Sequence, residues 1–167
     1  MKTKPEQVNL KGRFDVICRG PDGKVKWTDY AENLVVYEGL NHILDVLFIS
    51  TTGQIDPWYV GLCGASPAPA NADTLASHAG WTEFASYTGD RKEYVDARSN
   101  QQVTNSASKA SFSINQDSST IGGAFLASAA TGTSGALLCC AAFTGGNKSA
   151  DNGDTLEVTY TFSAASS

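Results

Sequence analysis

Hydrophobic and polar positions alternate most regularly near the C-terminus of the chain. In DTLEVTYTF, residues 154–162, every second side chain is apolar, and the residues between them are Thr or Glu. Because successive side chains of a strand point to opposite faces, this pattern predicts a β-strand with one buried and one solvated face. KASFSIN, residues 109–115, shows the same alternation. The apolar residues expected on the buried faces are Ala110, Phe112, Ile114, Leu156, Val158, Tyr160 and Phe162.

Shorter β-prone runs, separated by Gly, Pro, Ser and Asn, fill most of the remaining chain. Residues 13–31 contain two such runs around Pro-Asp-Gly at 21–23, which predicts a β-hairpin because these residues favour tight turns. The run at 58–62 is continuously apolar and predicts a strand that is buried on both faces. Further strands are expected at 93–97, 102–105, 119–128 and 135–143.

One segment has helical periodicity. In NLVVYEGLNHILDVLF, residues 33–48, apolar side chains recur at spacings of three and four, which places them on one side of an α-helix. We therefore expect one short helix in an otherwise β-rich chain. Its apolar side consists of Leu40, Ile43, Leu44, Leu47 and Phe48.

Together these elements predict an all-β fold, mainly antiparallel, built as a sandwich or a jelly-roll-like barrel with one short helix. A chain of 167 residues suffices for one hydrophobic core, and we assign residues 13–167 to a single β-rich domain. Residues 1–12 contain little apolar material and are expected to form an extended N-terminal arm in front of the hairpin. Periodicity does not distinguish jelly-roll from immunoglobulin-like strand order.

Charge and hydropathy narrow the class of partner. The formal net charge is −5 and the sequence pI is about 4.9, so the chain lacks the basic field that neutralises a nucleic-acid backbone. The N-terminal segment lacks the apolar core of a signal peptide, and no later stretch has the length of a membrane span. We expect a protein that is made in the cytoplasm and binds neither nucleic acid nor membrane.

The four cysteines show no paired spacing. A cytoplasmic product keeps Cys18, Cys63, Cys139 and Cys140 reduced, and we expect them to be small buried apolar side chains. Cys139 and Cys140 are adjacent in a predicted strand, so they point to opposite faces and are poorly placed to ligate one metal ion. We therefore expect no metal site and no cofactor.

Other polar motifs carry weak signals of chemistry. His42 lies in the predicted helix and His78 in a loop, and neither has a nucleophile motif nearby, so we expect no catalytic residues. The cluster DNGD, residues 151–154, indicates a tight turn before the last strand more strongly than a calcium site.

Two binding or catalytic alternatives remain open from the residue types. A hydrolase of the bacterial envelope needs a carboxylate pair such as Glu83 with Asp90 or Glu93, although their spacing offers no argument for it. A carbohydrate-binding module needs an exposed aromatic surface, and a β-domain also uses such residues to fill its core. The aromatic residues concerned are Trp58, Tyr59, Trp81, Phe84 and Tyr87.

The order of several segments resembles a group of small structural proteins of tailed bacteriophages. In that group an Asn-Leu-Val-Val / Gly-Leu-Asn-His segment precedes Trp-Tyr-Val-Gly-Leu, and a Gly-Ala-Phe strand precedes a terminal Leu-x-Val-x-Tyr-x-Phe strand. The resemblance covers residues 33–162, and its motifs concern the fold and not catalysis. The matching segments are NLVVYEGLNHILDVLF, WYVGLC, TEFASYTGDRKEYVDA, VTNSASKASFSIN, IGGAFLAS and DTLEVTYTF.

This resemblance implies a non-enzymatic virion component, and we expect a head decoration or cement protein on the outside of the major capsid protein shell. Such a protein stabilises the head by adding contact area as a symmetric homo-oligomer, here a dimer or trimer. Lys2, Lys4 and Lys11 are the candidate capsid contacts, because a cationic arm suits an acidic capsid surface. A tail, neck or fibre component and a carbohydrate-binding module are the alternatives.

Overall fold

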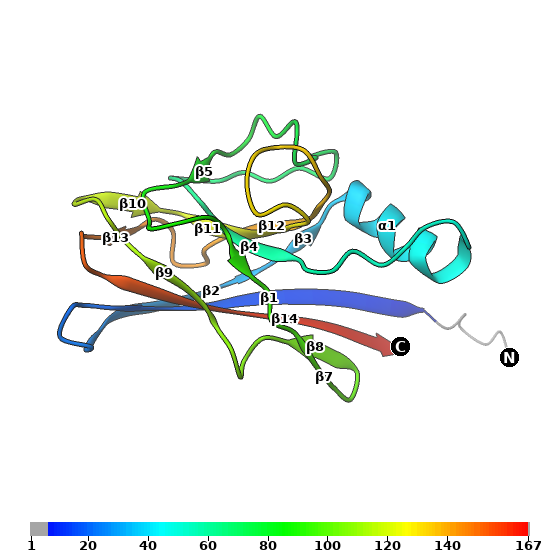
Figure 1. Cartoon of the computed structure of the whole chain (residues 1–167), viewed down its shortest axis with the longest axis horizontal. Coiled ribbons are helices and arrows are strands. Elements are labelled where there is room, and N and C mark those ends of the chain that lie inside the picture. Colours follow the sequence, from blue (N-terminus) through cyan, green and yellow to red (C-terminus); the bar gives the residue numbers. More distant parts are fainter. Residues whose placement is uncertain (1–6, 167) are drawn as a thin grey trace, which may run out of the picture.

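The computed structural model describes residues 7–166, which form two antiparallel sheets packed face to face with one helix at one end (Figure 1). Sheet A has the strand order β2 (Val25–Glu32), β1 (Val8–Arg19), β14 (Thr155–Ser166), β8 (Gln102–Thr104) and β7 (Ala97–Ser99). A further strand, β9 (Ala110–Ser113), also pairs with β14.

Sheet B has the order β3 (Leu34–Val35), β12 (Leu137–Ala142), β11 (Gly123–Ala127), β4 (Tyr59–Cys63) and β5 (Glu83–Phe84). β6 (Lys92–Glu93) also pairs with β4, and a separate ribbon joins β10 (Ser119–Ile121) to β13 (Lys148–Ala150). This arrangement confirms the predicted all-β sandwich with one short helix.

The longest element of sheet A is the ribbon of β1 and β14. These strands pair along their full length, from Val8 opposite Ser166 to Arg19 opposite Thr155. β1 continues into β2 through the predicted hairpin, whose turn contains Gly23 with a φ of +77°. A φ in this region favours glycine, which explains why the turn forms at this position.

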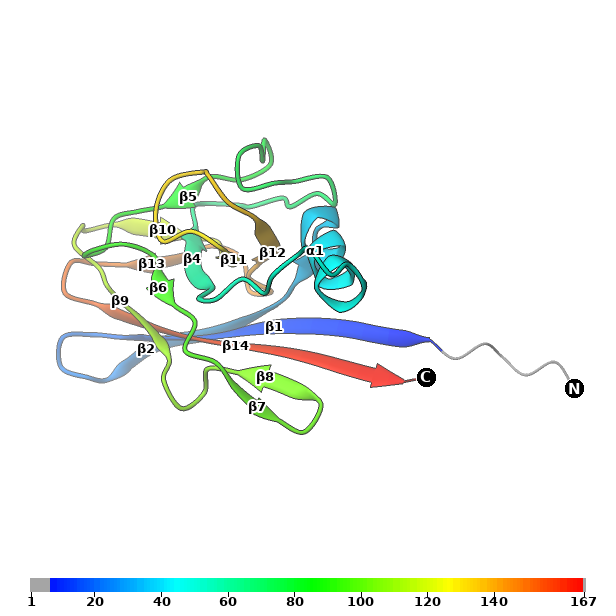
Figure 2. The ribbon, with the colours of Figure 1, turned by 45° about the vertical axis from the view of Figure 1, so that its right-hand side comes forward.

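The start of β1 lies inside the segment expected to be an arm. Residues 8–12 are the first five residues of β1 and pair with β14, so the ordered sheet begins before residue 13. Residues 1–6 of the expected arm lie outside the described residues. The N-terminal end of β1 and the C-terminal end of β14 lie at the same end of the sandwich (Figures 1 and 2).

The main core lies between the sheets and follows the predicted alternation in β14. Leu156, Val158 and Tyr160 are fully buried, and Phe162 packs against them from the edge of the core. The ring centroid of Tyr160 lies 4.4 Å from that of Phe14 in β1. Burial of these large apolar side chains is the main favourable contribution to folding.

Sheet B is buried on both faces, as predicted for residues 58–62. Its inner face contributes to the main core, and its outer face carries a second apolar cluster that includes Phe125. Trp81 and Leu75 of the long loop after β4 cover this cluster, with the Trp81 and Phe125 ring centroids 5.0 Å apart. The loop therefore acts as a third layer.

The predicted helix is confirmed as α1 (Tyr37–Phe48), although it starts later than the periodic segment does. Leu34 and Val35 pair with β12 as β3, so the chain must first leave sheet B. Gly39 then lets α1 approach β12 closely, because a Cβ at this position would overlap the carbonyl oxygen of Leu138. α1 stands at the end of the sandwich where the described chain begins and ends (Figure 2).

Candidate interaction surface

The apolar side chains of α1 are only partly covered by the sandwich. Ile43 packs against the main core, whereas Leu44, Leu47 and Phe48 have exposed fractions of 54%, 67% and 77%. A group of large exposed apolar residues on a small protein is typical of a binding surface. We call the exposed group the α1 patch: Leu44, Val46, Leu47, Phe48 and Ile49.

An apolar cleft of about 340 Å³ opens beside this patch, and Val46 and Leu47 belong to both. Its base reaches core residues of sheets A and B, so the two sheets are not fully closed at this end. The volume lies within the range of about 300–1,000 Å³ that is usual for ligand pockets. We call it the end cleft, and its apolar lining includes Ile43, Leu47, Ile55, Trp58, Leu126 and Phe162.

The polar lining of the end cleft is acidic. Asp56 and Asp96 contribute to it, and none of the described residues that line it is Lys or Arg. The rings of His42 and Trp58 lie in an edge-to-face arrangement, with 5.7 Å between their centroids. Two carboxylates in a lining that contains no Lys or Arg favour an apolar occupant that carries positive charge over one that carries negative charge.

Sequence reasoning identified three residues of the α1 patch, Leu44, Leu47 and Phe48, as part of the apolar side of the helix, and it did not predict that they are exposed. A helix turns by about 100° per residue, so the four consecutive apolar residues 46–49 cover every side of it, and the sandwich buries only one side. That run was the available signal for an exposed patch. No sequence signal predicted the end cleft, because residues that line it, such as Ile55, Asp96 and Phe162, are far apart in the sequence.

The cysteines are free and buried, as predicted. Cys139 faces the main core and donates its S–H to Tyr160 Oη at 3.4 Å, while Cys140 faces the outer cluster with its Sγ 3.5 Å from that of Cys63. Between residues 7 and 166, no three His, Cys, Asp or Glu side chains gather as a metal site. Burial raises the pKa of the Cys139 thiol to about 12, so this thiol stays protonated and inert at neutral pH.

The carboxylate considered for hydrolysis is held in an ion pair. Glu83 accepts hydrogen bonds from Nε and Nη2 of Arg91, both at 2.7 Å. The Arg91 side chain is only 2% exposed, and it also donates to two carbonyl oxygens of the loop after β11, both at 2.8 Å. Glu83 thus compensates a buried cation and anchors a loop, a structural task that differs from acid–base work with Asp90 or Glu93.

The five aromatic residues do not form one exposed stacking surface. Trp81, Phe84 and Tyr87 are buried, with exposed fractions between 4% and 9%. Trp58 is half-buried at the end cleft, and Tyr59 is half-buried in β4. Most of these aromatic side chains therefore fill the core, which was the alternative to a carbohydrate-binding surface.

Two other polar candidates have structural roles. His78 stacks on Trp81 with 3.7 Å between the ring centroids, and its Nδ1 lies 3.0 Å from the Trp81 carbonyl oxygen. In the DNGD turn, Lys26 Nζ lies 2.6 Å from Asp154 and 3.1 Å from Asp151. The lysine ammonium therefore pairs with both carboxylates that a calcium ion would need.

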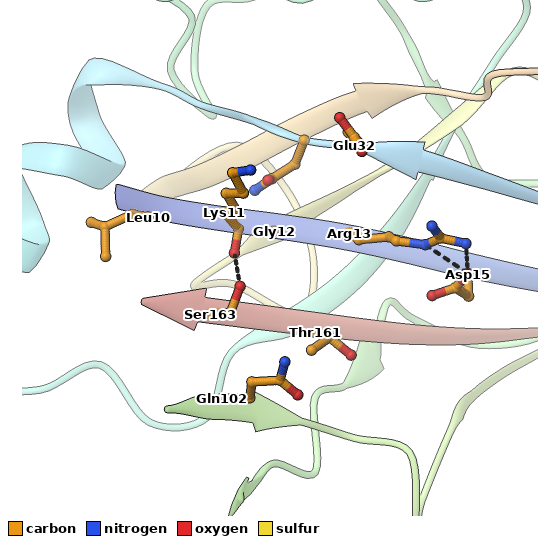
Figure 3. A pocket seen from close by; sticks show the side chains of 10 residues that line it. Leu10, Lys11, Gly12, Arg13, Asp15, Glu32, Gln102, Thr161 and Ser163 are labelled. Carbon is orange, nitrogen blue, oxygen red and sulfur yellow. Dashed lines mark hydrogen bonds and ion pairs between the residues drawn. The ribbon is translucent and has the colours of Figure 1, made fainter. Parts of the chain in front are cut away.

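The predicted capsid contacts fall partly outside the described chain. Lys2 and Lys4 lie outside the described residues, and Lys11 is an exposed residue of β1. Lys11 lines a groove with Arg13 and Thr161 (Figure 3). Arg13 in turn donates to Asp15 at 2.7 Å, so Lys11 is the cation of this group without an ion pair among residues 7–166.

The α1 patch and the end cleft together form the candidate interaction surface of the protein. No helix of the described chain is long and apolar enough to cross a membrane. Comparisons of the chain with protein-family models, with curated proteins and with solved structures found no match.

Proposed function

We propose that the protein is a non-enzymatic structural protein of a bacteriophage virion, which binds the outside of the major capsid protein shell and stabilises the head. The resemblance of residues 33–162 to small virion proteins supports the bacteriophage origin. The α1 patch supports the binding role and is the observation that carries the proposal, since Leu47 and Phe48 are more than two-thirds exposed in the isolated chain. The proposed role requires no cofactor.

Binding at the α1 patch stabilises an assembled shell by mass action, because the protein adds contacts that only the assembled state offers. The exposed parts of Leu44, Leu47 and Phe48 amount to about two whole side chains, and their burial contributes roughly 3–6 kcal/mol. Association costs about 4–15 kcal/mol in lost freedom. A single patch therefore binds weakly, and the function benefits from several linked patches or additional contacts.

The acidic lining of the end cleft defines the capsid segment that fits it best. Asp56 and Asp96 favour a segment with apolar side chains next to Lys or Arg. An acidic region of the capsid is the expected partner of Lys11, together with Lys2 and Lys4, on a different part of the molecule. The proposed interface thus combines apolar contacts at the α1 patch with two sets of charge contacts. The acidic end cleft meets cationic capsid side chains, and Lys11 meets acidic ones.

Capsid binding is tested with purified protein and bacteriophage heads that lack it. After incubation, sedimentation and particle imaging measure bound copies, and heating measures the resistance of the heads. We expect saturable binding at hundreds of copies, which head symmetry implies, and heads that withstand higher temperature. The double substitution Leu47→Ser and Phe48→Ser should weaken binding at least about 100-fold.

The matched control is Val25→Ser, because Val25 is 50% exposed and lies beside the hairpin at the opposite end of the sandwich (Figure 1). This variant should bind heads like the parent protein. Unchanged binding of the α1 double variant would reject the proposed surface. Protein located at the tail end of intact virions would assign it to a tail, neck or fibre component, and glycan binding lost in Trp58→Ala would assign it to a carbohydrate-binding module.

A further inference from the structure

The first four residues of β1, Val8 to Lys11, have an open edge on the side away from β14. β2 pairs with β1 only from Arg13 onward, and after Glu32 the chain leaves sheet A and enters sheet B as β3. Where the chain turns away, the Asn33 N–H donates to the Gly12 carbonyl oxygen at 2.9 Å. Asn33 thus lies opposite Gly12, and β1 continues for residues 8–11 without a strand beside it in the described chain.

The backbone groups of this edge are oriented to bind another strand. Because the Gly12 carbonyl points toward the open side, strand alternation directs the N–H and C=O groups of Leu10 and Val8 to the same side. Neither residue has a backbone partner there among residues 7–166. Proteins usually protect such edges with proline, bulges or several charges, and residues 8–12 contain only one charged side chain, Lys11.

We propose that two copies of this chain pair through these open edges, with residues 7–11 of the two copies antiparallel around a two-fold axis at Asn9. The register follows from the available length. Asn33 already lies opposite Gly12, and residues from Arg13 onward are paired with β2, so Val8 must lie opposite Leu10 of the other copy for the open backbone groups of both residues to be used. A register with the axis at Leu10 would place Val8 of one copy where Asn33 of the other copy lies.

The side-chain pattern of this register is self-complementary, as a two-fold interface requires. Asn9 of one copy faces Asn9 of the other, and Lys11 faces Gln7, on the outer side of the sheet. Val8 faces Leu10 on the inner side. Addition of a strand to an open sheet edge is a common mode of recognition.

The dimer is tested first by sedimentation equilibrium of the full chain over a range of concentrations. We expect reversible monomer–dimer behaviour. Leu10→Pro removes an N–H that points to the open edge and should weaken dimerisation at least about tenfold, whereas Leu10→Val keeps the N–H and should dimerise like the parent. A parent chain that stays monomeric, or a dimer that Leu10→Pro leaves unchanged, would overturn the proposal.

A cross-linking experiment tests the register and does not depend on tolerance of proline. In the proposed pairing the Asn9 residues of the two copies are a close, non-hydrogen-bonded pair, which suits a disulfide. Asn9→Cys chains under mild oxidant should therefore form disulfide-linked dimers at least about tenfold faster than Lys11→Cys chains. The native cysteines are all buried and should not compete. Equal rates in the two samples would reject this register, and with it the proposed interface. The interface does not depend on the proposed capsid role, so failure of one leaves the other intact.

Discussion

The outer face of sheet B and the exposed side of α1 are both apolar, but the chain treats them differently. Over sheet B, the long loop after β4 places Trp81 and Leu75 on Phe125 and leaves the cluster almost without solvent contact. Over α1 there is no such layer in the described chain, and Phe48 is 77% exposed. The same sequence therefore contains a complete cover for one apolar surface and none for the other.

This difference is the basis for the proposal that a partner covers the α1 patch. Covering an apolar surface internally requires a loop whose ordering costs conformational entropy, and the chain bears that cost at sheet B. A surface meant only for folding would gain from the same treatment. Exposure of Leu47 and Phe48 lowers solubility without stabilising the isolated chain, so a contact outside the chain is the best physical reason to retain them.

The largest expected contrast comes from the same substitution in the two regions. Phe125→Ala removes a fully buried ring that contacts Trp81 and should lower the free energy of unfolding by about 4 kcal/mol. Phe48→Ala removes an exposed ring and should change it by no more than about 0.5 kcal/mol. Urea unfolding at fixed protein concentration measures both. Equal effects would show that α1 is covered in solution and would remove the contrast.

The ion pair of Glu83 should contribute the next largest effect. Glu83→Ala leaves the buried Arg91 guanidinium without its carboxylate, and only two loop carbonyls then accept from it. Because Glu83 itself is partly exposed, water compensates some of the loss, and we expect a destabilisation of about 2 kcal/mol. The double variant Glu83→Ala with Arg91→Met should recover part of this stability. An unchanged unfolding midpoint in Glu83→Ala would contradict the structural role of the pair.

The sequence predicted the buried strands of the sandwich better than the exposed α1 patch and the open edge of β1. Alternation in 154–162 and the apolar run at 58–62 reflect burial by neighbouring strands, and both are as expected in β14 and β4. The pairing of residues 8–12 with the C-terminal strand joins the two ends of the chain, and periodicity does not encode such partners. The open edge of β1 also depends on the crossing at Asn33, which has no local pattern.

Alkaline pH should lower the free energy of unfolding through the buried thiol of Cys139. Burial raises the pKa of this thiol from 9.0 to about 12, so its contribution to stability is full below pH 9 and is lost as the pH rises toward 12. The unfolded chain releases a proton there that the folded chain retains, at about 1.4 kcal/mol for one pH unit above 9.0. Urea unfolding at about pH 8 and about pH 10 should show this loss, and Cys139→Ala should reduce it by that amount. An identical pH dependence in the variant would refute the assignment.

The smallest effect on stability is expected for the pair Leu44→Gln and Leu47→Gln on the α1 patch. Both side chains are more than half exposed in the isolated chain, so the free energy of unfolding should change by no more than about 0.5 kcal/mol. A matched Leu126→Gln substitution in the buried strand β11 should prevent folding, because it places an unpaired amide in the core.

The same unfolding measurement, repeated at several protein concentrations, distinguishes between two ways in which copies of the chain could associate. The proposed dimer pairs residues of β1 and none of the α1 patch, so the loss from Leu44→Gln and Leu47→Gln should stay small at every concentration. If the copies instead covered their patches against each other, the parent would gain stability with concentration and the double variant would not. A destabilisation that grows with concentration would therefore move the contact between copies from the β1 edge to α1, and it would leave the patch unavailable to the capsid.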